Sequence, residues 1–335
     1  MNEFFGISVV IPTYQRCTSV IRTLQALARQ TIASTEYEVI VSIDGSVDGT
    51  QELVSRFEAP YRLRALWQPN QGRASARNAG IRLSTGDLII FLDDDMEPTP
   101  GFVLAHRDAH PPGSRRGVVG AAPIPFDASA PPMVHYRRSG MDARLQRLAG
   151  QGYKLGFRDV YTSNLSVRRD VILEVGGFDE AFKLYGNEDY ELALRLLKAG
   201  VEFVYSSQAM AYQGYDKDFP ALARDSMARG HTAVLFAQKH PEVASTLRLG
   251  TYHQASPKWR LVRALLLVVS RILPWSPACA IAFMKWLERR RPPRLHHYYN
   301  LALDYFFWVG AQAALRQRSG TGRASSAALR TGVTR

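Results

Sequence analysis

Short apolar runs alternate with helix-like segments over the first third of the chain. The runs at residues 7–11, 37–43, 63–67 and 88–92 have the pattern of strands in a covered sheet. Between them, apolar residues recur at helical spacing, as they do through residues 20–27. This β-α alternation predicts an α/β fold with a doubly wound, mostly parallel sheet.

Beyond residue 98 the pattern is less regular. Residues 127–158 are polar and punctuated by glycine, which favours a mobile flap or acceptor loop. Strand and helix patterns return at 160–167, 169–175, 190–198 and 201–205. We therefore predict one domain over 1–215, with an N-terminal part of about 1–100 and a second part of about 101–215.

From about residue 216 only helical patterns remain. The apolar stretches at 261–273, 278–287 and 301–315 are interrupted by Arg or Pro, and none reaches the ~20 residues of a spanning helix. We expect a helical appendage over 216–315 and a disordered tail over 316–335, which is rich in Ser, Gly, Thr and Arg.

The net charge of +12 is concentrated in this C-terminal part. Residues 256–294 hold nine Lys and Arg against one acid, 315–335 hold five Arg and no acid, and 1–255 is neutral. A neutral body argues against nucleic acid as a ligand, whereas the basic appendage would attract anionic lipid. Two distant cysteines and a start without a basic leader fit a cytoplasmic protein.

Four of the five tryptophans lie in the basic region, and tryptophan favours the membrane interface. They are Trp259, Trp275, Trp286 and Trp308. We therefore expect peripheral attachment to the anionic inner face of the cell membrane. The alternative is that these helices pack on the first domain or form a homo-oligomer interface.

Three consecutive aspartates, Asp93, Asp94 and Asp95, follow the apolar run at 88–92. Carboxylates at a strand end repel one another, and a hard divalent cation such as Mn²⁺ or Mg²⁺ would relieve that repulsion. The alternative is a solvated acidic turn.

Other polar residues also follow predicted strands or open predicted helices. They are Thr13-Tyr14, Asp44, Arg77 and Glu188-Asp189. Because ligands of open α/β sheets bind beyond the carboxyl ends of the strands, we expect these residues to meet at one rim. An acidic side chain can accept a hydrogen bond from a base ring N–H, and a guanidinium can pair with phosphate. Together with a metal site, these groups suit a nucleoside diphosphate.

In this order, the motifs resemble those of family 2 glycosyltransferases, which have the nucleotide-sugar-binding GT-A fold. The matching segments cover residues 7 to about 205, and the most telling are Ser8–Tyr14, Glu38–Ser46, Asn70–Gly80, Thr85–Asp95, Gly176–Glu180 and Asn187–Glu191.

The resemblance implies roles for particular residues. Substrate-binding positions would be Pro12, Thr13, Tyr14, Arg16, Asp44, Arg73, Arg77, Asp93 and Asp94. Asp93 and Asp95 would form an Asp-x-Asp metal motif, and Asp189 would be the catalytic base with Glu188 beside it.

Alternatives stay open for several of these. Thr13 and Tyr14 could only shape their loop, Asp44 could cap a turn, Arg73 could be a solvated helix charge, and Glu188 could be an N-terminal helix charge. A family histidine that can join the metal is replaced by Gln213, with His231 and His240 as other candidates.

The implied activity is inverting transfer of a sugar, such as a hexose, from a nucleoside-diphosphate sugar to an acceptor hydroxyl. UDP is the favoured nucleotide, and the acceptor would be a saccharide or lipid-linked molecule of polysaccharide, glycolipid or glycoconjugate synthesis. A non-catalytic nucleotide-sugar sensor or scaffold is the alternative. A dinucleotide-binding oxidoreductase is disfavoured because no G-x-G-x-x-G follows the first strand.

Overall fold

The computed structural model describes residues 6–254 and 256–330, except for the side chains of 251–253 and 318–330. The chain divides into two compact units. The first unit comprises residues 1–183 and 188–216, and the second comprises 184–187 and 217–335.

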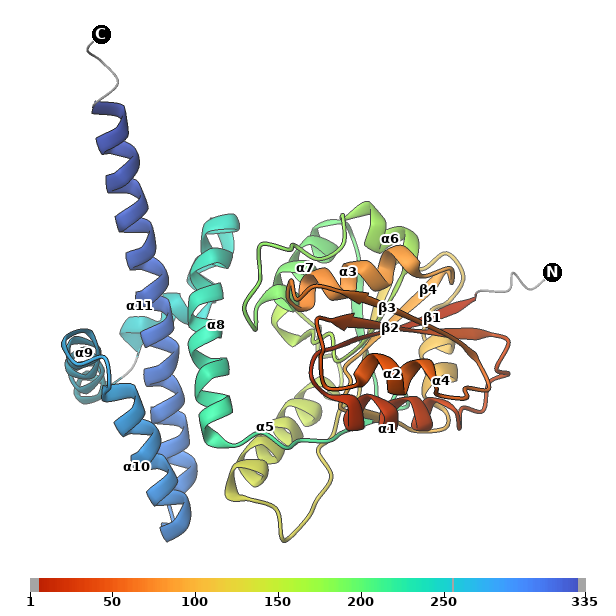
Figure 1. Ribbon diagram of the computed structural model, residues 1–335, viewed down its shortest axis with the longest axis horizontal. Coiled ribbons are helices and arrows are strands. Elements are labelled where there is room, and N and C mark those ends of the chain that lie inside the picture. The colour runs from red at the N-terminus through yellow and green to blue at the C-terminus, as the bar shows by residue number, and fades with distance from the viewer. Residues whose placement is uncertain (1–5, 255, 331–335) are drawn as a thin grey trace. The chain divides into compact units, whose positions relative to one another are not determined.

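A seven-stranded sheet forms the centre of the first unit, with strand order β3-β2-β1-β4-β7-β6-β8 (Figure 1). The strands are β1 (Ile7–Thr13), β2 (Tyr37–Asp44), β3 (Arg62–Gln68), β4 (Leu88–Leu92), β6 (Arg116–Gly120), β7 (Asn164–Arg168) and β8 (Glu202–Ser206). Only β7 runs antiparallel to its neighbours in this sheet. A small second sheet pairs β5 (Met96–Pro98) with β9 (Ala211–Gln213).

Helices cover both faces of the sheet. Figure 1 shows α3, α6 and α7 on one face and α1, α2 and α4 on the other. Their bounds are α1 (Cys17–Leu27), α2 (Thr50–Ser55), α3 (Arg73–Leu83), α4 (Phe102–Asp108), α6 (Arg169–Glu174) and α7 (Glu188–Lys198). The predicted α/β class and mostly parallel sheet are confirmed.

Burial explains why the apolar runs became central strands. Every residue of β1, β2 and β4 is buried, as expected for strands covered on both faces, whereas β3 at the sheet edge is partly exposed. The first strand extends two residues beyond the predicted apolar run at 7–11. Because β1 continues to Thr13, Pro12 lies opposite Ser42 inside the parallel ladder.

The segment predicted as a flap, 127–158, contains the 17-residue helix α5 (Pro132–Leu148) and the short 3₁₀ helix η1 (Phe157–Asp159). Only Met133 and Leu148 of α5 are buried. With so few core-facing positions, the segment lacks the apolar stripe that marks a packed helix in sequence.

The second unit is helical throughout its regular elements. They are α8 (Phe219–Lys239), η2 (Pro241–Thr246), η3 (Arg248–Gln254), α9 (Pro257–Ile272), α10 (Ser276–Arg290) and α11 (Leu295–Arg330). None of the described helices is both long and apolar enough to cross a membrane. Helix α11 reaches Arg330, and 331–335 lie outside the described residues, so the disordered tail expected at 316–335 stays a prediction.

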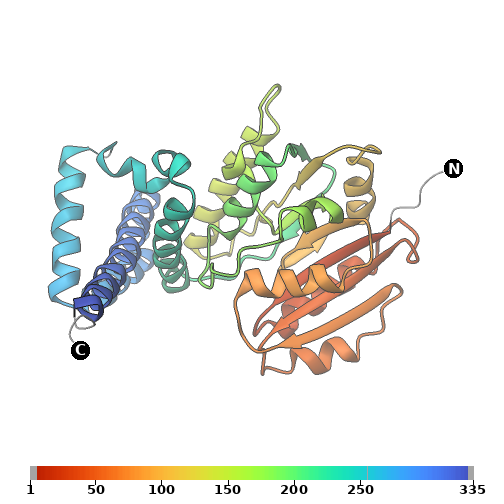
Figure 2. The same ribbon diagram turned by 90° about the horizontal axis from the view of Figure 1, so that it is seen from above.

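Two glycines allow α8 and α11 to pack closely, side by side in both views (Figures 1 and 2). A methyl group on Gly230 would collide with the backbone of Phe307, and one on Gly310 would collide with the backbone of Met227. Larger residues at these two positions would therefore force the helices apart.

Asp304 of α11 joins three elements of the second unit. Its carboxylate accepts hydrogen bonds from Arg248 of η3 (2.8 Å), from Trp259 and Arg263 of α9 (3.0 and 3.1 Å), and from Trp308 one turn away (3.2 Å). Because the Arg263 side chain is almost fully buried, this acid also neutralises a cation that has little access to water.

A buried polar network links α4 to β7 in the first unit. His106 Nε2 donates to Asn164 Oδ1 (2.8 Å), because the Asn164 amide nitrogen already donates to the carbonyls of Ala121 and Ala209. His106 Nδ1 then accepts from the Ser166 hydroxyl (2.8 Å), whose oxygen accepts from His110 Nε2 (2.7 Å). The network requires a neutral His106 ring, because its Nδ1 is an acceptor.

Burial lowers the pKa of His106 to about 4, opposed in part by its bond with Asn164. Burial also lowers the pKa of His110 to about 3, with further lowering from His106, Arg168 and Arg116. An unfolded histidine has a pKa near 6.5, so between about pH 6.5 and 4 the unfolded chain binds more protons than the folded one. Stability must therefore fall as the pH falls through this window.

For His106 alone, we expect the free energy of unfolding to drop by about 2–3 kcal/mol between pH 7 and pH 4.5. Urea unfolding at several pH values should show a shallower acid slope for His106→Asn, whatever its stability at pH 7. The surface variant His297→Asn of α11 should keep the wild-type slope. Identical slopes in all three proteins would contradict the assignment.

Candidate active site

The carboxyl ends of β1, β2 and β4 lie at the same edge of the sheet, because the three strands are parallel and adjacent. β1 is the switch point, with the chain-consecutive β2 on one side and β4 on the other. The Thr13 hydroxyl donates to Asp94 Oδ2 (2.7 Å), so the loops after the first and fourth strands meet directly. The expected convergence of Thr13 and the aspartates is observed.

The three aspartates take different partners. Asp93 accepts from Arg77 (3.0 Å), and Asp94 accepts from Thr13 and lies 3.4 Å from Arg16 Nε. Asp95 Oδ2 lies 3.8 Å from Arg16 Nη2. Burial is the largest cause that raises the pKa of Asp94 to about 7, followed by the adjacent negative charge of Asp95. The acidic loop is therefore a buried, charge-crowded site and not a solvated turn.

Arg77 is the most buried cation of this edge, with 1% of the residue exposed. Its Nη2 donates to Asp93 (3.0 Å), its Nη1 donates to Glu188 (3.2 Å), and its guanidinium lies 5.3 Å from the ring centre of Phe178. Arg77 thus bridges the end of β4 and the start of α7. Glu188, left open in sequence as catalytic support or helix charge, is a buried ion-pair partner.

Arg73, one turn earlier on α3, is exposed. Tyr14 is half-exposed at the loop after β1, and Asp189 is half-buried at the second position of α7. One oxygen of Asp189 accepts from the backbone N–H of Tyr190 (2.9 Å). Each of these three side chains keeps some contact with solvent.

Asp44 holds the turn that precedes α3. Its carboxylate accepts from the Gln68 side chain (2.8 Å) and from the backbone N–H groups of Gln71 and Gly72 (2.9 Å each). Gly72 has φ +94°, a conformation that glycine adopts without strain. Asp44 therefore shapes this turn, and its contact with a base stays a prediction.

Two residues were missed by sequence reasoning. Asn78 of α3 donates to the Phe178 carbonyl (2.8 Å) and accepts from the Phe178 N–H (2.8 Å), which ties α3 to the turn before α7. Asp216 accepts from Arg16 at 3.2 and 3.3 Å. Asn78 stood in a motif that suggested a role, whereas no sequence pattern links Arg16 to a residue 200 positions away.

The donor set of the acidic loop suits a divalent cation. Mg²⁺ and similar ions bind one or two carboxylates and complete their shell with water and substrate oxygens. Gln213 lies on β9 beside this loop, where the Gly214 N–H donates to the Asp95 carbonyl (2.7 Å). Within the described part of the chain, no three His, Cys, Asp or Glu residues are grouped as a ready metal site. His231 and His240 belong to the second unit.

The sequence model described as Glycosyl transferase family 2 matches residues 8–176, about half of the chain. A second model, Glycosyltransferase like family 2, matches residues 142–259. The first match includes the acidic loop and the motifs of both β1 and α3.

The chain belongs to glycosyltransferase family 2.

Known relatives agree with this assignment. Validoxylamine A glucosyltransferase of Streptomyces hygroscopicus subsp. jinggangensis is 33% identical over 266 residues, covering 72% of this chain and 62% of that protein. Chondroitin synthase of Escherichia coli is 26% identical over 237 residues, covering 62% of this chain and 34% of that protein. The chain therefore spans about three fifths or less of the length of these relatives.

Solved structures confirm the GT-A fold. A mannosyltransferase from Pyrobaculum calidifontis, solved with GDP-Man and Mn²⁺, has a TM-score of 0.61 at 18% identity, covering 92% of this chain and 88% of that one. TarS 1–349 of S. aureus, solved with UDP-GlcNAc, has a TM-score of 0.52 at 17% identity, covering 93% and 92%. At these identities the likeness concerns the fold alone.

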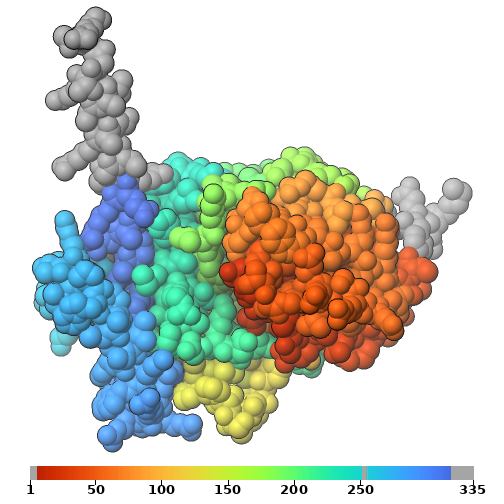
Figure 3. All heavy atoms as spheres, viewed as in Figure 1, coloured from red at the N-terminus to blue at the C-terminus, as the bar shows by residue number. Residues whose placement is uncertain are grey.

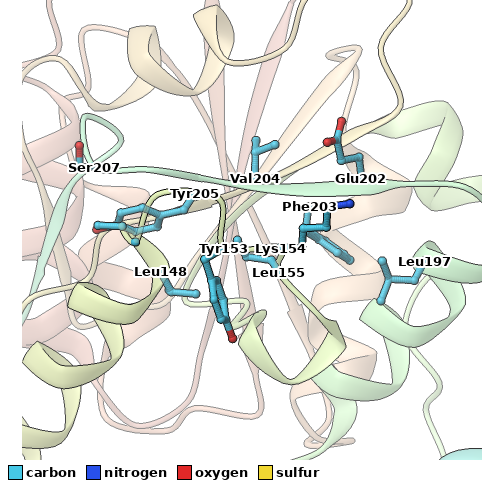
Figure 4. Close-up of a pocket in the computed structure, with 12 residues that line it drawn as sticks. Leu148, Tyr153, Lys154, Leu155, Leu197, Glu202, Phe203, Val204, Tyr205 and Ser207 are labelled. Atoms are coloured by element: carbon cyan, nitrogen blue, oxygen red, sulfur yellow. The ribbon is translucent and has the colours of Figure 1, made fainter.

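This family 2 chain also has a hollow of about 660 Å³ along the edge strand β8 (Figure 4). Its lining combines apolar side chains such as Leu148 and Phe203 with the rings of Tyr153 and Tyr205. Part of its lining, including Leu148 and Tyr153, comes from the segment 127–158 that was predicted to be a flap or acceptor loop.

The buried bridge made by Arg77 gives a prediction about stability. Arg77→Gln leaves Asp93 and the buried Glu188 without their cation, and we expect a loss of about 3–5 kcal/mol in the free energy of unfolding. Arg73→Gln removes the same charge from the exposed part of α3 and should change stability by about 0.5 kcal/mol or less. Chemical unfolding of both variants tests this, and equal losses would rule out the buried bridge.

Proposed function

We propose that this family 2 chain transfers a sugar from a nucleoside-diphosphate sugar to an acceptor hydroxyl, with inversion at the anomeric carbon. The observation that carries the proposal is the meeting of Thr13, the acidic loop and α7 at the carboxyl edge of the sheet. Known relatives with glucosyltransferase and chondroitin synthase names support it. A UDP-sugar is the favoured donor.

The proposed roles follow from the positions of the side chains. Pro12, Thr13 and Tyr14 line the end of β1 and would contact the nucleoside, while exposed Arg73 would lie near the phosphates. Asp93 and Asp95 would hold Mn²⁺ or Mg²⁺, which supplies positive charge to a departing diphosphate when bound. We assign Arg77 to organising these acids, because its guanidinium is already enclosed by Asp93 and Glu188.

Asp189 is the proposed general base. It would accept the proton of the acceptor hydroxyl as that oxygen bonds to the anomeric carbon. The bond between this carbon and the phosphate oxygen breaks on the opposite face, and the electron pair leaves with the nucleoside diphosphate. A positioned base contributes about 10²–10⁴-fold to such a step. The acceptor would be a saccharide or lipid-linked molecule of polysaccharide or glycoconjugate synthesis, and the hollow beside β8 is a candidate for part of its site.

Asp189→Asn keeps the side-chain shape and removes the proton acceptor. Once a thermal-shift screen of nucleotide sugars with Mn²⁺ has identified the donor, we expect donor affinity to stay within a few-fold and turnover to fall by about 10²-fold or more. Asp170→Asn is a matched control, because Asp170 has the same place in α6 and the same bond to the next N–H (2.9 Å). Donor binding without transfer or hydrolysis in the wild type would favour the sensor or scaffold instead.

We also propose that the second unit attaches the protein to the inner face of the cell membrane. The outward face of α9 is apolar, with Leu261 74%, Leu265 63%, Val268 51% and Ile272 69% exposed. These positions recur at helical spacing opposite the buried Arg263 and Leu267, so they form an unburied stripe. Figure 3 shows atoms of α9 and α10 at the surface of the second unit.

The tryptophans divide into two pairs. Trp275 and Trp286 are 60% and 50% exposed, and Phe283 stacks on Trp286 with ring centres 5.8 Å apart. Trp259 and Trp308 instead donate to Asp304 inside the unit. Two tryptophans, rather than the expected four, are therefore available to a membrane interface. Exposed basic residues accompany the apolar stripe, and they are Lys258, Arg260, Arg271, Lys285, Arg289 and Arg290.

Full-length protein should bind vesicles containing phosphatidylserine, more weakly as salt rises. Leu265→Glu with Ile272→Glu should reduce this binding by at least about tenfold, because each leucine-sized side chain contributes about 1.5–3 kcal/mol when buried. Val47→Glu, at an exposed site of the first unit, is the control. Vesicle sedimentation measures the binding. A wild-type dimer that the double variant disrupts, with no vesicle binding at low salt, would show that the stripe is an oligomer interface.

A further inference from the structure

Arg16 occupies a distinctive position among the acids of the active-site edge. It is the residue immediately before α1, and its guanidinium lies among three carboxylates. Its Nε is 3.4 Å from Asp94 Oδ1, and its Nη2 is 3.8 Å from Asp95 Oδ2 and 3.2 Å from Asp216 Oδ1. The Arg16, Asp94 and Asp95 side chains are 24%, 11% and 13% exposed, whereas Asp216 is 69% exposed.

The other arginine of this edge has different partners. Arg77 donates to Asp93 and Glu188, so the acidic loop meets one guanidinium on each side. Arg16 therefore supplies positive charge to Asp94 and Asp95. Asp95 is also a proposed ligand of the divalent cation, so a bound ion and Arg16 would compete for the same carboxylate.

Asp216 is a second ion-pair partner for Arg16, outside the acidic loop. It follows β9 by three residues, and both of its oxygens accept from Arg16 Nη2, at 3.2 and 3.3 Å. The Arg16 side chain is long enough to keep this outer pair while its inner contacts are given up. A pairing with an exposed acid costs little to retain or to lose.

We propose that Arg16 is an internal counter-ion that competes with the divalent cation for the acidic loop, and that Asp216 holds it when the cation enters. This inference rests on the proposed metal site of the transferase. Its consequence is weak cation binding in the absence of donor. A donor diphosphate gives Arg16 another anionic partner, so donor and cation then promote each other's binding by the same factor.

Calorimetric titration with Mn²⁺ alone, without nucleotide, tests the competition and needs no activity. Arg16→Gln should bind Mn²⁺ at least about tenfold more tightly than the wild type, because a cation a few ångströms from a half-buried ligand has been removed. Arg29→Gln removes the same charge from an exposed position just after the far end of α1 and should change the affinity by no more than about twofold at 0.15 M salt.

Asp216→Asn tests whether the Arg16–Asp216 pair holds Arg16 away from the cation, and it should change the Mn²⁺ affinity in the opposite direction to Arg16→Gln. It should weaken Mn²⁺ binding in the wild-type background, because Arg16 loses its outer partner, and should have little effect in Arg16→Gln. Such a double-mutant cycle isolates the pairwise contribution. A stability effect of Arg16 on the start of α1 alone would leave all Mn²⁺ affinities equal.

Asp95→Ala separates this inference from the proposed function. If it abolishes Mn²⁺ binding while Arg16→Gln binds like the wild type or more weakly, the metal site stands and the competition is refuted. If Asp95→Ala binds like the wild type, the proposed metal site is wrong and the competition falls with it. If neither the wild type nor Arg16→Gln binds Mn²⁺ without nucleotide, the competition is refuted, because removal of Arg16 should have revealed binding.

Discussion

Negative charge gathered at the carboxyl ends of parallel strands is the constraint on which the first unit depends. Three adjacent carboxylates cannot all be withdrawn from water unless cations or hydrogen-bond donors face them. Here the balance comes from Arg77 on one side, Arg16 on the other, and the Thr13 hydroxyl between them. The raised pKa of Asp94, caused first by burial and then by Asp95, shows that this compensation is incomplete. A divalent cation at this edge would complete it.

Helix α3 connects the acidic loop to the start of α7. Arg77 and Asn78 are neighbours on α3, yet they bind Glu188 and Phe178, which lie 111 and 100 positions later in the chain. The small residues around them are buried, so α3 lies close against the sheet. The same helix turn thus positions the acidic loop and the start of α7, where Asp189 lies. If Asp189 is the base that we propose, this support would keep it at a constant distance from the proposed donor site.

In the second unit the charge to be balanced is positive. Most of its basic residues are at the surface, but Arg263 is buried and depends on Asp304, which also accepts from Trp259 and Trp308. This inward network gathers two tryptophans and leaves the opposite face of α9 without a polar partner among the described contacts. An apolar stripe exposed on the outward face of a helix, such as that of Leu261, Leu265, Val268 and Ile272, is typical of a surface that binds a membrane or another chain.

Local pattern determined much of the first unit. Continuous apolar runs predicted β1, β2, β3 and β4, because a strand covered on both faces needs no polar side. The motifs at their ends predicted which residues would stand at the carboxyl edge of the sheet. The sequence could not predict that β7 runs antiparallel, because its direction depends on strand pairing far along the chain. Nor could it predict α5, which has almost no core-facing positions.

For the candidate site, sequence determined which residue types stand at the strand ends, and tertiary structure decided which of them face one another. Arg73 and Arg77 were both predicted to bind substrate, with a solvated helix charge as the alternative for Arg73. The fold buries Arg77 against Asp93 and Glu188 and leaves Arg73 exposed. Similarly, nothing near Arg16 in the chain pointed to Asp216. The physical reason is that charge pairing depends on distance in space and on exclusion of water, and both are set only when separate segments of the chain pack together.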